Sequence, residues 1–548
     1  MLSRRDLIKA APLGALGIAS PGAKRLMAAV ESSSPVDKPN ILLIISDGHR
    51  EGLTKRSGYP LDTSPALDQL AQSGVAFDRA YATAPVCAPS RTSFITGRWP
   101  QAHRVRQNSQ TQAAYFAKDI FDVVKSKGYR TGLIGKNHTY LQPAKLNVWR
   151  QYDHICGWKP ENPPQEIIDF ENWMGRLDFG DSHVPTPFPL ETQFPYRIVS
   201  DAIEFMRESG DQPFALEMSF PEPHDPEQLP KRYWDMYPPA EVPEQGAGPD
   251  ALKDKGFKWR WLQGLQEDTY PDAENSWRRY KSNYLGMLRL LDDQLARLLT
   301  HMREQHLLEK TIIVYVADHG DYLMDYGLMR KGVGMPESLI RIPMVWSGCG
   351  IQGGQPHHPA FVSIADVMPT ICEAIGAEIP QGVQGRSLWP LLQGKDYPLE
   401  EFRSMYAEVG FGGLYYDRAD HVPFSIAQFR GLGPCAVRDA DEVFDELNQV
   451  TQSGSMAMVR MGDWALFYDM MGYGQLYNLQ SDPMELNNLF GTPAVAAKQA
   501  QLVQELLAWT IRTQDSLPAG IYETKWATRE HNWYAPYRHG TAPEAFIP

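Results

Sequence analysis

Three polar residues come directly after apolar runs that are typical of buried strands. Asp47 follows the run in KPNILLIISDGHR (38–50), and Asp318 and His319 follow TIIVYVA (311–317). Because ligands gather at the carboxyl ends of the strands in α/β sheets, we expect these side chains to converge. Converging carboxylates suit a hard divalent cation, calcium or magnesium. A single aspartate after a strand more often caps a helix or forms a turn, so the prediction depends on the combination.

The stretch CAPSRTSFITGR (87–98) begins with a cysteine, Cys87, whose residue type allows four chemistries. Cys87 could form a disulfide, bind a metal, act as a nucleophile or fill a small apolar space. The chain has five cysteines, at positions 87, 156, 349, 372 and 435, and no two of them are close in sequence. An odd number leaves at least one thiol outside any disulfide.

Alternating strand-like and helix-like segments must position these residues. A helix-like segment (64–82) with Ser64 as N-cap follows the first strand, and a helix and a strand follow at 121–138. A further strand over 213–226 runs into a proline-rich turn, and a long amphipathic helix precedes the strand 311–317. This alternation predicts an α/β fold with a large, mainly parallel sheet sandwiched by helices. Short alternating runs after residue 400, such as MAMVRMGDWALFYDM, predict a smaller antiparallel sheet.

The domain organisation expected from these patterns has three parts. Residues 1–31 contain Arg4 and Arg5 before a short apolar run, as in a twin-arginine-type signal peptide, and predict export to the periplasm or the cell exterior. The alternative is a disordered basic N-terminus. A catalytic α/β domain is expected over 38–400, and a C-terminal subdomain with a wrapping tail over 401–548. No other apolar stretch is long enough to span a membrane.

The overall composition narrows the class of protein. Hydrophobic residues make up 43% and charged residues 22% of the 548 positions, which is typical of a globular protein. The net charge of −13 argues against a general nucleic-acid binder, because phosphate backbones bind to basic surfaces. If the substrate is an anion, basic residues near the site must overcome this negative field.

The stretch around Cys87 resembles the signature of the sulfatases, in which Cys-x-Pro-x-Arg is followed by a Thr-Gly pair. These positions are held by Cys87, Pro89, Arg91, Thr96 and Gly97. The resemblance implies a formylglycine-dependent, Cys-type sulfatase of the alkaline-phosphatase-like superfamily. It further implies that a formylglycine-generating enzyme oxidises Cys87 to formylglycine, an aldehyde whose hydrate is the nucleophile.

Further segments resemble the same family over most of the chain after the signal. GKNH supplies Lys136 and His138, which the resemblance places at the sulfate and the formylglycine, and PEPHDP supplies His224 near the leaving group. ADHGDYLMDYGLMRKG supplies Lys331 as a sulfate contact. IADVMPT and GRSLWPLL resemble segments that look structural, and LYNLQSDPMELNNL resembles a C-terminal stretch of the family.

The resemblance also implies a metal site, for Ca²⁺ or alternatively Mg²⁺. Its ligands would be Asp47, Cys87, Asp318 and His319. Many sulfatases have two aspartates at the end of the first strand, whereas this chain has Gly48 after its single aspartate. The cation would then bind more loosely, depend on histidine and water, or recruit His49.

The implied mechanism requires that the negative charge of the sulfate ester be neutralised before attack. The groups that would do so are the cation, Arg91, Lys136 and Lys331. Asp318 would take a proton from the aldehyde hydrate, and His224 would protonate the leaving oxygen. His138 would then remove the second hydroxyl proton, so that sulfate is expelled and the aldehyde returns. An unmodified thiol has no second hydroxyl with which to do this.

Two other functions stay open. A phosphonate monoester or phosphodiester hydrolase of the same superfamily resembles this chain around HRVRQN (103–108) but lacks the pair Lys136 and His138, which therefore favours sulfate. An inactive carbohydrate-binding homologue would account for Gly48. The expected substrate is a sulfated polysaccharide or oligosaccharide, with aryl or choline sulfate as alternatives. The 14 tryptophans could stack on sugars, although packing is the commoner role.

Overall fold

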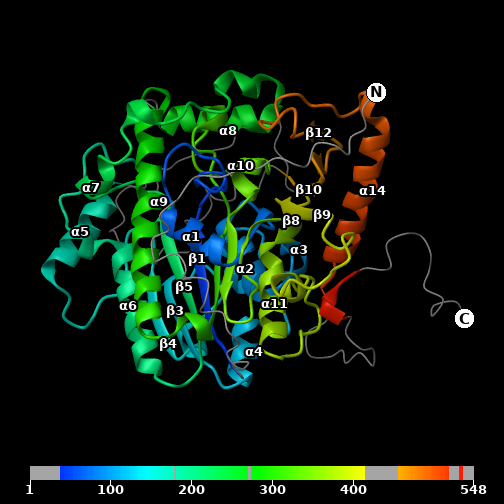
Figure 1. Ribbon diagram of the computed structural model, residues 1–548. Coiled ribbons are helices and arrows are strands. Elements are labelled where there is room, and N and C mark those ends of the chain that lie inside the picture. Colours follow the sequence, from blue (N-terminus) through cyan, green and yellow to red (C-terminus); the bar gives the residue numbers. More distant parts are fainter. Residues whose placement is uncertain (1–37, 178–179, 270–272, 414–453, 517–529, 535–548) are drawn as a thin grey trace, which may run out of the picture. The chain divides into compact units, whose positions relative to one another are not determined.

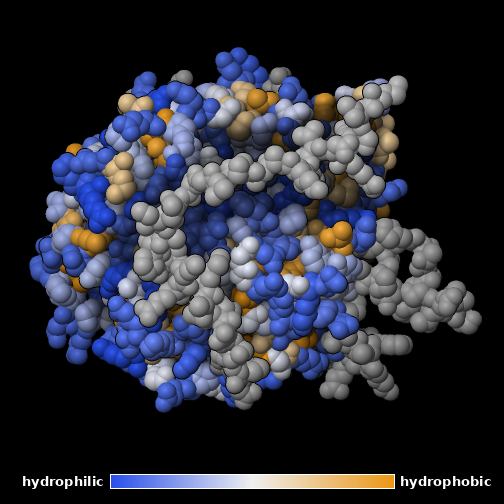
Figure 2. Space-filling model, viewed as in Figure 1, coloured by the Kyte–Doolittle hydropathy of each residue, from blue (hydrophilic) through white to orange (hydrophobic). Residues whose placement is uncertain are grey.

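The computed structural model describes residues 38–177, 180–269, 273–413, 454–516 and 530–534 (Figure 1). The expected signal segment 1–31 and most of the expected tail lie outside these residues. Within the described ranges, no helix is both long and apolar enough to cross a membrane. Hydrophilic residues predominate on the face shown in Figure 2, and hydrophobic residues are scattered over it.

The larger sheet has eight strands in the order β4-β3-β5-β1-β6-β7-β2-β8. Every neighbouring pair is parallel except the two pairs that include β7. The strands are β1 (Asn40–Asp47), β2 (Val75–Tyr81), β3 (Arg130–Lys136), β4 (Val148–Tyr152), β5 (Phe214–Pro223), β6 (Thr311–Ala317), β7 (Met344–Gly348) and β8 (Gln355–Ser363). The predicted large, mainly parallel sheet is confirmed.

Helices cover both faces of this sheet because its central strands are apolar on both sides. Ile41, Leu43 and Ile45 of β1 belong to one core, whereas Leu42 and Ile44 belong to the other. On the first face pack α2 (Cys87–Thr96), α4 (Ile120–Ser126) and α11 (Val367–Ala374). On the second face pack α1 (Pro65–Ser73), α6 (Phe194–Ser209) and α9 (Ala273–Glu304), and Figure 1 shows α6 and α9 side by side.

The second sheet is antiparallel, with the order β12-β11-β10-β9, as predicted. Its strands are β9 (Ser404–Val409), β10 (Met456–Met461), β11 (Trp464–Asp469) and β12 (Gly474–Asn478). One face packs on α14 (Ala496–Thr513) through Leu502, Leu506 and Trp509. The other α-helices in the described residues are α3 (Pro100–His103), α5 (Gln165–Arg176), α7 (Lys231–Trp234), α8 (Phe257–Thr269), α10 (Glu337–Ile340) and α12 (Trp389–Leu392).

One helical segment was predicted too long. Residues 64–82 form the helix α1 and then the strand β2, with a break at Gly74 between them. A Cβ at Gly74 would lie 2.0 Å from the carbonyl oxygen of Trp346, so the strand follows at once in a space that only glycine fits. Ser64 holds the N-cap position, but its side chain makes no capping hydrogen bond.

The strand order explains how distant residues come together. The adjacent strands β3, β5, β1 and β6 end at Lys136, Pro223, Asp47 and Ala317, and His224 and Asp318 come directly after β5 and β6. All four strands are parallel, so their carboxyl ends lie along one edge of the sheet. The polar residues predicted at strand ends are therefore neighbours.

Candidate active site

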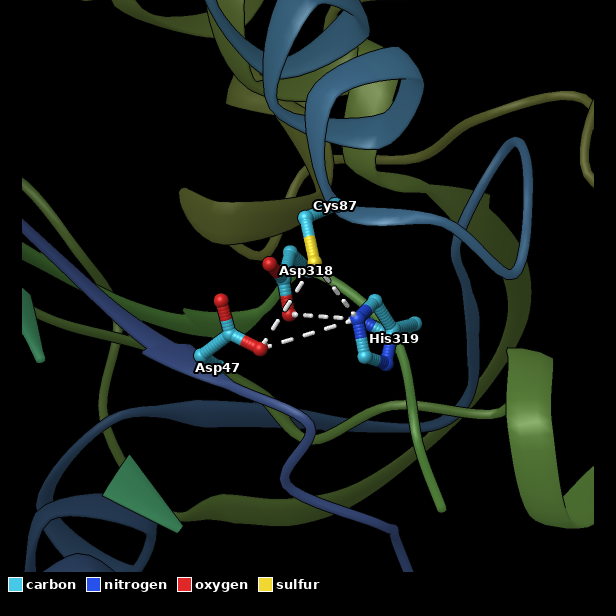
Figure 3. Close-up of side chains that lie close together, drawn as sticks. All are labelled: Asp47, Cys87, Asp318 and His319. Atoms are coloured by element: carbon cyan, nitrogen blue, oxygen red, sulfur yellow. Dashed lines mark hydrogen bonds and ion pairs between the residues drawn. The ribbon is translucent and has the colours of Figure 1, made fainter. Parts of the chain in front are cut away.

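Four buried side chains meet at this edge of the sheet: Asp47, Cys87, Asp318 and His319 (Figure 3). Their possible ligand atoms all lie within 4.8 Å of one another. His319 Nε2 lies 3.6 Å from Asp47 Oδ1 and 3.7 Å from Asp318 Oδ1. His319 Nδ1 lies 2.7 Å from the carbonyl oxygen of Gly320, which leaves Nε2 to face the carboxylates. Two carboxylates and an imidazole nitrogen are a donor set that fits a divalent cation.

A proton competes for the same imidazole nitrogen. Burial, the largest influence, lowers the pKa of His319, but the charges of Asp318 and Cys87 and the hydrogen bond with Cys87 together outweigh it, and the net shift is upward. A protonated imidazole has no lone pair to offer, so a proton on Nε2 would exclude a cation from this nitrogen.

Arg91 holds the two carboxylates in place from the second turn of α2. Its Nε donates to Asp318 Oδ2 at 2.7 Å, and its Nη2 donates to Asp47 Oδ2 at 3.1 Å. A third bond, 2.7 Å from Nη1 to the Ser219 hydroxyl, ties Arg91 to β5. Because Arg91 binds the Oδ2 atom of each aspartate, the Oδ1 atoms face His319. Asp318 Oδ1 also accepts the backbone N–H groups of Gly48 and His319.

Cys87 is the first residue of α2 and carries a free thiol. Its Sγ lies 3.2 Å from His319 Nε2, 3.2 Å from Lys331 Nζ and 3.8 Å from Asp47 Oδ1. Burial and Asp47 oppose ionisation, but the charges of Lys136, Lys331 and His319 outweigh them and lower the pKa of Cys87 well below its usual value. A helix N-terminus adds to the preference for negative charge at this position. In a formylglycine hydrate, an oxygen atom would take the position of this sulfur atom.

Two lysines flank the cluster. Lys136 Nζ, at the end of β3, lies 2.5 Å from Asp47 Oδ2. Lys331 Nζ lies between Cys87 Sγ, at 3.2 Å, and His224 Nε2, at 3.0 Å. The charges of Cys87, Asp47 and Asp318 raise the pKa of Lys331 above its usual value, although burial alone would lower it. Lys331 is therefore held as a cation between the cysteine and His224.

His138 and His49 stand apart from these contacts. Within the described residues, no hydrogen bond or ion pair joins His138 to the cluster, and its buried Nδ1 has no hydrogen-bond partner. His49 Nδ1 lies 2.9 Å from the hydroxyl of Tyr315, and burial lowers the pKa of His49 to about 4. His49 is not among the clustered ligands, so the structure does not favour its recruitment. Gly48 has a φ of 73° and contributes only its backbone N–H to Asp318.

Two residues at the site were missed from the sequence. His154 follows the edge strand β4, and its Nε2 lies 2.6 Å from Lys136 Nζ. Asp225 is buried, and its Oδ1 lies 2.9 Å from His224 Nδ1. Both lie two residues after a strand, so the signal that revealed Asp47, a polar residue at the end of a strand, could have found them. The polar sequence VWRQY hid the strand before His154.

This chain is similar in sequence and in fold to known proteins. A family model described as Sulfatase matches residues 39–377. A choline-sulfatase of Rhizobium meliloti is 26% identical over 92% of this chain and 93% of its own length. An N-acetylglucosamine-6-O-sulfatase of Bacteroides thetaiotaomicron is 24% identical over 90% of this chain and 89% of its own. The crystal structure of a phosphonate monoester hydrolase of Agrobacterium radiobacter has the same fold, with a TM-score of 0.70, 21% identity and coverage of 87% of this chain and 96% of that one. The chain belongs to the sulfatase family and is a sulfuric ester hydrolase.

Proposed function

We propose that this sulfatase hydrolyses sulfate monoesters of carbohydrates with a nucleophile made from Cys87. The observation that carries the proposal is the position of Lys331, whose ammonium lies 3.2 Å from Cys87 Sγ and 3.0 Å from His224 Nε2. A cation between a nucleophile and a candidate proton donor is suited to an anionic ester group that is attacked from one side and released on the other.

The proposal includes two additions to the chain. A divalent cation, Ca²⁺ or Mg²⁺, would be held by the four residues of the cluster, and it would supply positive charge to the ester oxygens. A formylglycine-generating enzyme would oxidise Cys87, and the hydrated aldehyde would supply one hydroxyl for attack and a second for the release of sulfate. The signature around Cys87 and the low pKa of its thiol support a reactive position.

The residues around Cys87 have distinct tasks in this proposal. Arg91, Lys136 and Lys331 would neutralise the ester, because each donates N–H groups beside the cysteine or its carboxylate neighbours. His224 would give a proton to the leaving oxygen from Nε2, which would first have to exchange its contact with the Lys331 ammonium for a proton, while Asp225 holds Nδ1. His138 is proposed to take the second hydroxyl proton, which requires its ring to approach Cys87 once the ester is bound.

The predicted role of Asp318 as the first base is the least supported of these tasks. Its carboxylate already accepts bonds from Arg91 and from two backbone N–H groups. A proton on this carboxylate would have to weaken at least one of these bonds, and each bond to a charged group contributes about 1.5–3 kcal/mol.

Carbohydrate substrates are proposed from the relatives together with the N-terminal sequence. Relatives at 24% identity are described as acting on N-acetylglucosamine 6-O-sulfate and on ulvan. A twin-arginine-type segment at 1–31 supports export, which would bring the enzyme to polymers outside the cell membrane. Choline sulfate is the leading alternative, because a choline-sulfatase matches 92% of this chain.

The test is a substrate panel with protein made alongside a formylglycine-generating enzyme. Release of free sulfate is measured from sulfated mono- and oligosaccharides, choline sulfate and an aryl sulfate, and a phosphonate monoester is included for the alternative activity. We expect the highest kcat/KM on a sulfated saccharide, its loss on chelation and its return with Ca²⁺ or Mg²⁺. A higher kcat/KM on the phosphonate monoester, or activity that chelation leaves unchanged, would contradict the proposal.

A further inference from the structure

His154 links two parts of the site that no sequence motif connects. It lies two residues after β4, at the edge of the larger sheet, beside the end of β3. Its Nε2 is 2.6 Å from Lys136 Nζ, and its ring contacts that of His224 in a tilted arrangement, with 4.1 Å between the ring centroids and 38° between the ring planes. One side chain therefore contacts both the lysine that binds Asp47 and the histidine at the leaving-group side.

The contact with Lys136 fixes the form of the imidazole. An ammonium group can only donate, so His154 Nε2 must accept, and the ring proton lies on Nδ1. Burial lowers the pKa of His154 well below its usual value, and the charge of Lys136 lowers it further, in agreement with a neutral ring. Lys136 thus donates one N–H group to Asp47 and one to His154. Because these two groups are held, the direction of the third N–H group is fixed.

The same arrangement recurs on the other side of this ring contact. Lys331 Nζ contacts His224 Nε2 at 3.0 Å and Cys87 Sγ at 3.2 Å. The site therefore contains two lysine–histidine pairs that are joined by the tilted contact of the two histidine rings, one bound to Asp47 and the other to Cys87. A displacement of His154 would move Lys136 directly and His224 through the ring contact.

We propose that His154 is a positioning residue that holds Lys136 toward the sulfate group as a neutral acceptor and supports the ring of His224. The inference rests on the proposed function, since it takes the anion between Cys87 and the two lysines to be sulfate. His154 touches neither Cys87 nor the clustered carboxylates in any hydrogen bond found in the described residues. The contacts through which we expect it to act are those with Lys136 and His224.

Two variants test the two features of His154 separately, its hydrogen-bond acceptor and its ring. His154→Phe keeps a ring for the contact with His224 but removes the acceptor, and His154→Gln keeps an acceptor but removes the ring. Affinity for inorganic sulfate is measured by calorimetry with the cation present, and kcat and KM are measured on the preferred ester. We expect His154→Phe to weaken sulfate binding by about tenfold or more, because the lost bond is to a charged group. His154→Gln should retain sulfate affinity within about threefold and lower kcat more than KM.

A double-mutant cycle with Lys136→Met tests whether His154 acts through the lysine. In the Lys136→Met background, His154→Phe should change sulfate affinity by less than about twofold, since the acceptor has nothing left to hold. An equal loss in both backgrounds would overturn the inference, as would His154→Phe with unchanged affinity or a wild-type protein that does not bind sulfate. Thermal unfolding and the mass of the Cys87 peptide are recorded for every variant, so that misfolded or unconverted protein is recognised.

The two proposals fail in different ways. If the wild type binds sulfate and the variants follow the expected pattern, but no sulfate ester is hydrolysed, the proposed function fails and the role of His154 stands. If esters are hydrolysed and His154→Phe matches the wild type in both sulfate affinity and kcat/KM, the proposed function stands and the inference fails.

Discussion

Two arginines, Arg91 and Arg386, are each buried between two carboxylates, yet their surroundings differ. Arg91 lies between Asp47 and Asp318. Arg386 lies between Asp366, at 3.2 Å, and Glu401, at 4.0 Å. Both arginines are almost fully buried. Burial and ion pairing alone therefore do not distinguish a catalytic site from a structural one.

The other groups around the two arginines distinguish the two sites. Arg386 donates to the carbonyl oxygens of Phe361 and Glu401 and lies against the rings of Phe402 and Trp509. These contacts join the end of β8 to the start of the second sheet and to α14, as expected for the structural segments IADVMPT and GRSLWPLL. Around Arg91 the further neighbours are a thiol, two lysines and several histidines. Groups that can react or carry extra positive charge distinguish the proposed catalytic site from the structural one.

The largest expected effect is on turnover, from Cys87→Ala. The variant should lose at least about a thousandfold in kcat, because it removes the group from which the nucleophile is made. Its free energy of unfolding should stay within about 1 kcal/mol of the wild type, since one small buried side chain replaces another. Residual turnover of a tenth or more would show that Cys87 is not the nucleophile. Steady-state kinetics and denaturant unfolding measure the two quantities.

For Arg386→Met we expect the opposite pattern, a loss of stability with little change at the site. Removing one partner of a buried ion pair leaves an uncompensated carboxylate, which costs about 3–5 kcal/mol of unfolding free energy. The protein that remains folded should bind sulfate like the wild type. Arg91→Met is the matched variant, and it should lose both stability and sulfate affinity. Equal behaviour of the two variants in both assays would remove the distinction between the two arginines.

The variant Lys331→Met tests whether positive charge beyond that of Arg91 is needed at this site. The variant should lower kcat/KM by about 10²–10³-fold, the usual loss when one preorganised donor to a developing charge is removed. Lys145→Met is the control, because Lys145 pairs with Asp119 and Asp122 and contacts neither the thiol nor a site histidine. A comparable loss in kcat/KM for Lys145→Met would mean that the effect of Lys331 is not local.

The smallest expected effect is on stability, from the variant Glu217→Gln. It tests a carboxyl group that is buried near Arg91 and forms no ion pair in the described residues. Burial raises the pKa of Glu217 on β5 to about 7, even though the charge of Arg91 opposes the shift. The folded state therefore keeps a proton that the unfolded state has released, so this carboxyl lowers stability as pH rises from about 4.5 to about 7. Glu217→Gln should be more stable than the wild type by about 2–3 kcal/mol above pH 7. The difference should vanish below about pH 4.5. A difference in unfolding free energy that is the same at pH 4.5 and pH 8 would contradict the shift.

The sequence predicted the parts of this picture that depend on continuous apolar strands and on local motifs. The strands β1 and β6 are buried on both faces, so their apolar runs and the aspartates after them were recognisable. The edge strand β4 and the strand β2 have mixed sequences, and their pairing depends on neighbours far along the chain. For that reason the sequence alone predicts a helix over 64–82 and does not reveal His154. The contacts of Lys331 with both Cys87 and His224 also needed the fold, because these residues are more than 100 positions apart.

The mass of the tryptic peptide 80–91 from active protein shows whether Cys87 is the precursor of the nucleophile. We expect the thiol to be replaced by an aldehyde in the same proportion as the enzyme that can turn over. The matched sample comes from cells without a formylglycine-generating enzyme, and both its aldehyde content and its activity should be low. A protein that hydrolyses sulfate esters with Cys87 entirely as a thiol, while a control sulfatase from the same cells is converted, would contradict the claim.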